Sequence, residues 1–148
     1  MLATAWWFDL DGTLIDSVTG MSLRPHAVEL LERLRGQGIP VVLWSAGGDD
    51  YAARRADQTG IAYLFDAVYS KLGRDGAGRW LLPQTPERHR PAVFVDDQPD
   101  ELPALGRAVR VPAYIGPNSR DRALRLLADS LTADRATVDH DNMDGAGR

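Results

Sequence analysis

The sequence predicts an α/β protein: a single Rossmann-like, doubly wound domain with a mainly parallel central sheet. Short apolar runs alternate with amphipathic segments along the 148 residues, and this alternation is typical of strands and helices around a parallel sheet. A chain of this length can bury one core but not two ordinary ones. Polar residues end several of the apolar runs, at the sheet edge where open α/β folds bind ligands.

The first half of the chain predicts three strands and two helices. The strands are expected at residues 5–8, 41–44 and 67–69, where short apolar runs occur. The helices are expected at residues 24–35 and 49–60, the second beginning with two acidic residues and ending at a glycine. The first helix has one apolar face, formed by Ala27, Leu30, Leu31 and Leu34.

The second half predicts two more strands and two more helices. The clearest apolar run, residues 92–95, predicts a fourth strand, and residues 109–111 add a fifth. A short helix is expected between them, at residues 99–107. The last helix should begin near Asn118 or Ser119, and its apolar face is formed by Leu124, Leu127, Ala128 and Leu131.

Two segments do not follow this alternation. Residues 73–90 are rich in glycine, proline and arginine, which predicts a long loop or an exposed hairpin. Trp80 in this segment either packs against the hairpin or stacks on a substrate. Residues 132–148 lack apolar periodicity and predict a disordered tail, so the folded domain is expected to span residues 1–131.

Composition excludes several classes of protein. The absence of cysteine rules out disulfides, thiol nucleophiles and cysteine-bound zinc. A net charge of −4 gives no strong electrostatic footprint for nucleic-acid binding. No apolar stretch approaches the roughly 18 residues that a membrane helix needs. We therefore expect a cytoplasmic protein that binds no membrane.

The candidate functional residues share one position in the predicted sheet. Asp9, Ser45, Lys71 and Asp97 each lie at or just after the C-terminal end of a predicted strand, and in a parallel sheet these ends meet at one edge. Alone, each has a structural explanation: Ser45 could cap a helix, and Lys71 could be a solvated surface residue. Their joint placement favours one functional cleft.

The chemistry that suits this cleft is phosphoryl transfer. Several carboxylates close together repel one another unless a divalent cation neutralises them, and oxygen ligands favour Mg²⁺. The cation would screen a carboxylate that approaches an anionic phosphate. A lysine would offset the remaining charge, and a serine hydroxyl with backbone N–H groups could hold the phosphate oxygens. Magnesium is thus the expected cofactor, and a phosphorylated molecule the expected substrate.

Four short motifs resemble those of the haloacid dehalogenase (HAD) superfamily and occur in that family's order. The run from Asp9 to Thr13, Asp-Leu-Asp-Gly-Thr, resembles the first motif. Ser45 resembles the second and Lys71 the third, and the acidic pair at residues 96–97 resembles the fourth. The resemblance implies a phosphatase-type member, that is, a magnesium-dependent phosphomonoester hydrolase.

The resemblance implies a role for three residues of the first motif. Asp9 would be the nucleophile that forms an aspartyl-phosphate, and one of its oxygens would also bind the metal. Asp11 would protonate the leaving group, activate the hydrolytic water and offer its backbone carbonyl to the metal. Thr13 would orient Asp9 through its hydroxyl.

The other motifs would supply the substrate and metal ligands. Ser45 and the backbone amide of Ala46 would hold the phosphate, and Lys71 would steady both the phosphate and the nucleophile. Asp97 is implied as the direct metal ligand of the acidic pair. Asp96 would act through a metal-bound water.

The resemblance also implies a site without a cap domain. The two positions where the family inserts caps hold only residues 14–23, enough for a short flap, and residues 47–70, taken up by one helix and one strand. Substrate selection would then depend on the substrate's bulk, on a neighbouring subunit in a homo-oligomer, or on the loop at residues 73–90. Capless members act on phosphoproteins and nucleic-acid ends or on small phosphorylated metabolites, and both classes stay open.

Two other classes of protein share features of this predicted site. A receiver-type signalling domain also uses an acidic magnesium site, but there the acidic pair precedes the phospho-accepting aspartate, whereas here the pair comes last. A catalytically silent protein that binds phosphate and magnesium for regulation remains an alternative, although no motif residue is missing.

Overall fold

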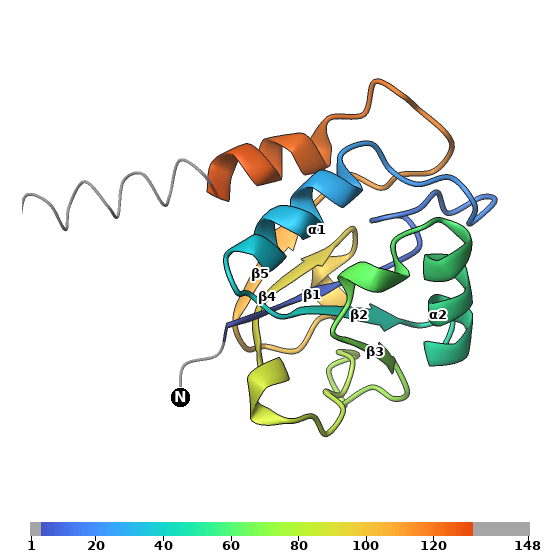
Figure 1. Cartoon of the computed structure of the whole chain (residues 1–148). Coiled ribbons are helices and arrows are strands. Elements are labelled where there is room, and N and C mark those ends of the chain that lie inside the picture. The colour runs from blue at the N-terminus through green and yellow to red at the C-terminus, as the bar shows by residue number, and fades with distance from the viewer. Residues whose placement is uncertain (1–3, 132–148) are drawn as a thin grey trace, which may run out of the picture.

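Five parallel strands form one sheet in the order β3-β2-β1-β4-β5, as the computed structural model of residues 4–131 shows (Figure 1). The strands are β1 (Ala5–Phe8), β2 (Val41–Ser45), β3 (Ala67–Ser70), β4 (Pro91–Asp96) and β5 (Arg107–Arg110). The chain winds outward from β1 to one side and then builds the other side, so the order reverses between β1 and β4. The predicted fold class is confirmed, and the sheet is parallel throughout.

Helices cover one face of this sheet. The first two are α1 (Ala27–Gly36) and α2 (Asp49–Gln58), and a third occupies residues 123–131. Both α1 and α2 connect strands that step in the same direction along the sheet, so right-handed crossovers place them on the same face. The three helices pack against every second residue of β1, β2 and β4, namely Trp6, Phe8, Val41, Leu43, Val93 and Val95.

The opposite face is aromatic and carries little regular structure. The chain from β3 to β4 crosses it as an irregular segment with one short 3₁₀ helix, η2 (Glu87–His89). Beneath this segment, the rings of Trp7 and Trp44 meet edge to face at 5.2 Å, and Tyr69 stacks on Trp7 at 5.4 Å. Large aromatic side chains bury enough area to form a core layer without a helix above them.

The buried indoles on this face also fix the backbone around them. Trp7 Nε1 donates to the carbonyl of His89 at 2.7 Å, and Trp44 Nε1 donates to the carbonyl of Ser70 at 3.1 Å. The first bond ties β1 to the chain just before β4, and the second ties β2 to the last residue of β3. The two bonds therefore hold the chain just before the segment at residues 71–90 and near the end of that segment.

Two predicted helix starts were wrong, each because a side chain or a backbone turn intervenes. The first helix begins at Ala27 rather than residue 24, because the buried Arg24 side chain turns away to bind Asp121 at 2.8 Å. His26, just before the helix, has a left-handed φ of 69°. The last helix begins at residue 123 rather than near 118, after a turn in which the Asp121 carboxylate accepts the N–H of Ala123.

The helix predicted at residues 99–107 is only the 3₁₀ turn η3 (Pro99–Glu101). Pro103 has no N–H to continue a helix. Gly106 has a φ of 64° and lies so close to β4 that a Cβ there would be 2.8 Å from the Ala92 carbonyl oxygen. The chain therefore turns directly into β5, which begins two residues earlier than predicted, at Arg107.

The remaining expectations have mixed outcomes. Within residues 73–90, an isolated antiparallel bridge pairs Arg74 with Trp80, so a hairpin is confirmed for its first half. No helix within residues 4–131 is long and apolar enough to cross a membrane. The tail predicted at residues 132–148 lies outside the described residues.

Candidate functional site

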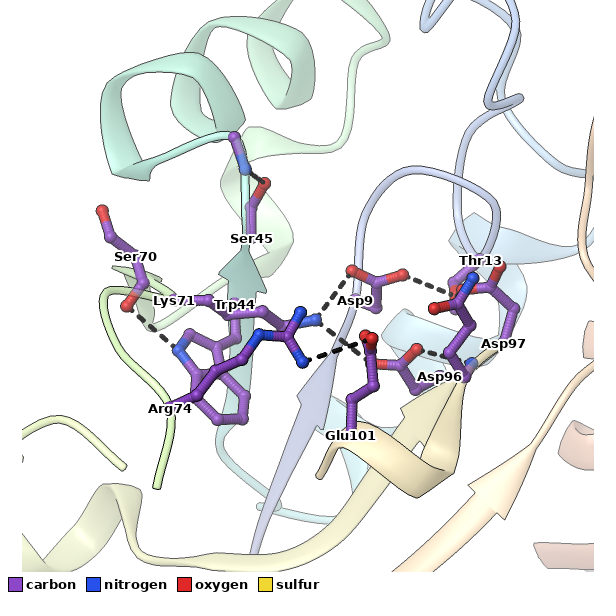
Figure 2. Close-up of polar contacts among 12 residues, drawn as sticks. Asp9, Thr13, Trp44, Ser45, Ser70, Lys71, Arg74, Asp96, Asp97 and Glu101 are labelled. Atoms are coloured by element: carbon purple, nitrogen blue, oxygen red, sulfur yellow. Dashed lines mark hydrogen bonds and ion pairs between the residues drawn. The ribbon is translucent and has the colours of Figure 1, made fainter. Parts of the chain in front are cut away.

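The sheet places the predicted site residues at the ends of four neighbouring strands. Asp9 directly follows β1 and Ser45 ends β2, while Lys71 directly follows β3 and Asp96 ends β4. Figure 2 shows these side chains converging from their separate strands. The parallel register puts these ends side by side, with Ser45 opposite Ser70.

A cavity of about 510 Å³ lies at this edge of the sheet. Seven of the eight predicted site residues line it: Asp9, Asp11, Ser45, Ala46, Lys71, Asp96 and Asp97. Thr13, the eighth, is fully buried behind the cavity. The fold thus brings all the sequence-predicted residues to one place.

Lys71 is the cationic centre of the cavity. Its Nζ donates to Asp9 Oδ1 at 3.1 Å and to Asp96 Oδ2 at 3.2 Å (Figure 2). Burial alone would lower the pKa of Lys71, but the charges of Asp9 and Asp96 outweigh it and raise that pKa above its usual 10.5. The lysine is therefore charged at neutral pH and holds two carboxylates from different strands.

Thr13 and Gly12 set the position of the acidic groups on the other side of Asp9. Thr13 Oγ1 lies 3.2 Å from Asp9 Oδ2 and 3.4 Å from Asp97 Oδ1. Gly12 has a φ of 82°, and a Cβ there would be 2.7 Å from Asp97 Oδ2. Only glycine tolerates both this conformation and this approach without strain.

The carboxylates of Asp9, Asp96 and Asp97 form a group that fits a hard cation. Each offers an oxygen, and these oxygens lie within 4.8 Å of one another. Burial, against the opposing charge of Lys71 and with the charge of Asp96 adding to it, raises the pKa of Asp9 to about 8. Burial likewise raises the pKa of Asp96. A single lysine leaves this group with excess negative charge, and an oxygen-ligated divalent cation would relieve it.

Asp11 stands apart from this group of three. Its carboxylate accepts a hydrogen bond from the Tyr51 hydroxyl at 2.9 Å. The expectation that Asp11 binds a metal concerned its backbone carbonyl and stays a prediction. Sequence reasoning did not predict this contact of Tyr51, although the place of Tyr51 in the first turn of α2, six residues after Ser45, was a usable signal.

The predicted phosphate-binding corner lies at the end of β2. The Ser45 side chain is buried, and its Oγ accepts the N–H of Gly47 at 3.1 Å. Since this bond uses an acceptor lone pair, the hydroxyl proton stays available for a ligand. Ser45, Ala46 and Gly47 all line the cavity, so the geometry is compatible with the predicted role.

The hairpin after β3 contributes residues that the motifs did not indicate. Arg74 stacks on the Trp80 ring at 4.0 Å. It also forms an ion pair with Glu101 at 3.2 Å (Figure 2). All three line the cavity. Trp80 is half-buried against the aromatic face, and Arg74 covers its ring. Trp80 is therefore a packing residue and not an open surface on which a substrate stacks.

The flap between β1 and α1 is short, as predicted. Residues 14–23 return through an antiparallel bridge between Ile15 and Leu23. The fully buried Asp16 carboxylate accepts the backbone N–H groups of Thr19, Met21 and Ser22. The flap is thus a rigid turn beside the cavity and contains no cap domain.

Comparisons with known proteins identify a family whose function has no description. Residues 5–79 match the family described as "Protein of unknown function (DUF705)". The chain belongs to this family. A 65-residue segment of this DUF705 protein is also 37% identical to an uncharacterized 36.0 kDa protein of Orgyia pseudotsugata multicapsid polyhedrosis virus. That match covers 43% of this chain but only 21% of the viral protein.

Two solved structures share the fold of this DUF705 protein. One is a haloacid dehalogenase-like hydrolase from Streptococcus pneumoniae, with a TM-score of 0.50, 16% identity, and coverage of 67% of this chain and 78% of that one. The other is an uncharacterized protein from Listeria monocytogenes serotype 4b, with a TM-score of 0.54, 17% identity, and coverage of 88% and 97%. The chain therefore shares the fold of these two proteins.

Proposed function

We propose that this protein is a HAD-type, magnesium-dependent phosphomonoester hydrolase that works through an aspartyl-phosphate on Asp9. The observation that carries the proposal is the setting of Asp9: its carboxylate is held by Lys71 and Thr13 beside two further carboxylates, at the edge of a parallel sheet. A nucleophile needs this kind of fixed orientation.

In the first step, an Asp9 oxygen attacks the phosphorus and the bond from phosphorus to the ester oxygen breaks. Lys71 Nζ and the Ser45 hydroxyl hold the phosphoryl oxygens. Asp11 gives a proton to the departing ester oxygen, which leaves as an alcohol. In the second step, Asp11 takes a proton from water, the water oxygen attacks phosphorus, and Asp9 is released as a carboxylate together with inorganic phosphate.

Asp9, Asp96 and Asp97 are the residues that would hold Mg²⁺, because their oxygen donors are mutually close. When bound, the ion would supply charge that offsets the repulsion between carboxylate and phosphate. Asp96 already binds Lys71 Nζ and the backbone N–H of Gln98. That engagement supports Asp97 as the direct ligand of the pair and Asp96 as the one that acts through water.

The open cavity and its short flap leave room for more than one class of substrate. Phosphorylated small molecules and phosphorylated macromolecules both fit such a site, and in the first case a second subunit of a homo-oligomer would complete the enclosure. A screen of phosphorylated metabolites, phosphopeptides and 5′- or 3′-phosphorylated oligonucleotides would separate these classes.

The proposal is tested by phosphate release from p-nitrophenyl phosphate with Mg²⁺, comparing wild type with Asp9→Asn. We expect turnover by the wild type and a loss of at least about 1,000-fold in the variant, because the amide is not a nucleophile. Equal rates for the two proteins would contradict the proposal. An inactive wild type that still binds phosphate and Mg²⁺ would favour the regulatory alternative.

A further inference from the structure

Tyr51 lies in a slot that two glycines leave open. Its ring passes so close to Gly47 that a Cβ there would be 2.5 Å from Tyr51 Cδ1. Its hydroxyl lies beside Gly20 of the flap, where a Cβ would be 3.2 Å away. Two separate segments thus lack a side chain where Tyr51 needs room. The side chain is held on both sides, and its hydroxyl has a defined position.

The hydroxyl is directed at one oxygen of Asp11. Tyr51 Oη donates to Asp11 Oδ1 at 2.9 Å. Burial and the Asp11 carboxylate both raise the pKa of Tyr51 above its usual 10. The phenol therefore keeps its proton at neutral pH and remains a donor. Because Oδ1 already accepts this hydrogen bond, Oδ2 is the less engaged oxygen, and we assign it the exchange of a proton with other groups in the cavity.

This contact also explains why Asp11 is separate from the other acids. Among residues 4–131, the carboxylates close enough to share one cation are those of Asp9, Asp96 and Asp97. Asp11 lines the same cavity but is bound from the opposite side, by a residue of α2. A carboxylate drawn into a cation site could not face the ester oxygen of a substrate.

We infer that Tyr51 is a positioning residue, which holds Asp11 so that the Oδ2 oxygen faces the leaving group. The inference rests on the proposed function, since it assigns a purpose to Tyr51 only if Asp11 is the general acid. It also predicts a specific defect. Loss of the Tyr51 hydroxyl should impair protonation of the leaving group while the nucleophile and the phosphate-binding corner stay intact.

The leaving group of the substrate tests this defect. Phenyl phosphates with para substituents differ little in size, but 4-nitrophenolate departs as a stable anion whereas unsubstituted phenolate depends more on protonation. The ratio kcat/KM reports steps up to the first irreversible one, here the transfer of the phosphoryl group to Asp9. It therefore excludes the later hydrolysis of the aspartyl-phosphate, which is common to all these substrates.

The experiment compares wild type, Tyr51→Phe and Tyr63→Phe over the series from 4-nitrophenyl to 4-methylphenyl phosphate, with Mg²⁺. Tyr63→Phe is the matched control because Tyr63 also donates to a carboxylate, Glu32, at 3.0 Å, but on the protein surface. Phenylalanine keeps the ring of Tyr51 between the two glycines, and the thermal midpoint of each variant verifies folding.

We expect kcat/KM of Tyr51→Phe to fall about 10-fold for phenyl phosphate and less than about 3-fold for 4-nitrophenyl phosphate, a fraction of what a general acid contributes. The control should match the wild type throughout. An equal loss for every ester, or no loss, would overturn the inference and leave the proposed function standing. A wild type that cleaves none of the esters would instead refute the proposed function, and the inference with it.

Discussion

Asp9 and Asp16 lie on the same stretch of chain and are little exposed, yet their surroundings shift their pKa values in opposite directions. Burial raises the pKa of Asp16, but hydrogen bonds from Thr19, Ser22 and Met21 outweigh it and lower that pKa to about 2. Burial raises the pKa of Asp9 to about 8, with Asp96 adding to the shift and Lys71 opposing it.

The difference separates a structural carboxylate from one that suits the proposed catalytic role. Donors of the flap surround Asp16, so its charge stabilises the turn that it organises. Asp9 shares its space with other acids and one lysine, so its negative charge destabilises the protein without a cation. A buried aspartate therefore indicates a functional site only when its neighbours leave its charge uncompensated.

The largest expected effect is on thermal unfolding without metal. Substitutions of the two aspartates should shift the unfolding midpoint in opposite directions. Asp16→Ala leaves three backbone N–H groups of the flap without their acceptor and should lower the unfolding midpoint by about 5–10 °C. At about pH 9, where Asp9 is ionised, Asp9→Asn removes an uncompensated charge and should raise the midpoint by about 2–5 °C.

Asp75 provides the control for the flap. It also accepts two backbone N–H groups, those of Ala77 and Arg79, but in an exposed hairpin. Asp75→Ala should therefore lower the midpoint by less than about 3 °C. If Asp16→Ala were as mild as Asp75→Ala, burial would not be what makes the Asp16 turn important.

Each aspartate should make the stability of the protein depend on pH over a different pH range. Asp9 holds its proton in the folded state up to about pH 8 but loses it near pH 3.8 when unfolded. The folded state binds more protons between these values, so stability falls as pH rises from about 4 to about 8. For Asp16 the sign reverses, and its contribution is present above pH 3.8 and lost as pH falls through about 2.

Urea unfolding of the metal-free protein between pH 2 and pH 9 measures both windows. Asp9→Asn should flatten the decline between pH 4 and pH 8, although Asp96, whose pKa is also raised, should leave part of it. Asp16→Asn should instead weaken the loss below pH 4. A wild-type profile that Asp9→Asn leaves unchanged would show that this carboxylate carries no buried charge.

The smallest expected effect is stabilisation by Mg²⁺. Binding to the folded state alone should add about 1.4 kcal/mol at ten times the dissociation constant. The gain should disappear in Asp97→Asn and persist in Asp75→Ala, which lies outside the cation group. Sodium chloride at equal ionic strength controls for screening. A gain of equal size in Asp97→Asn would place the cation elsewhere.

By itself, the sequence determined the sheet and the residues at its edge. Apolar runs locate β1, β2, β3 and β4 to within a residue or so of each end, because buried strands must be continuously apolar. The polar residues that end those runs had to meet at one edge, because parallel strands share a direction. Asp9, Ser45 and Lys71 could therefore be grouped before any contact was known.

The tertiary structure decided what depends on partners distant in sequence. It showed that the Arg24 side chain binds Asp121 before α1 begins. It also showed that aromatic rings rather than helices cover the second face of the sheet. It also paired Asp11 with Tyr51 and shifted the pKa values of Asp9 and Asp16 in opposite directions. The physical reason is that burial and hydrogen-bond partners, unlike periodicity, are properties of the assembled chain.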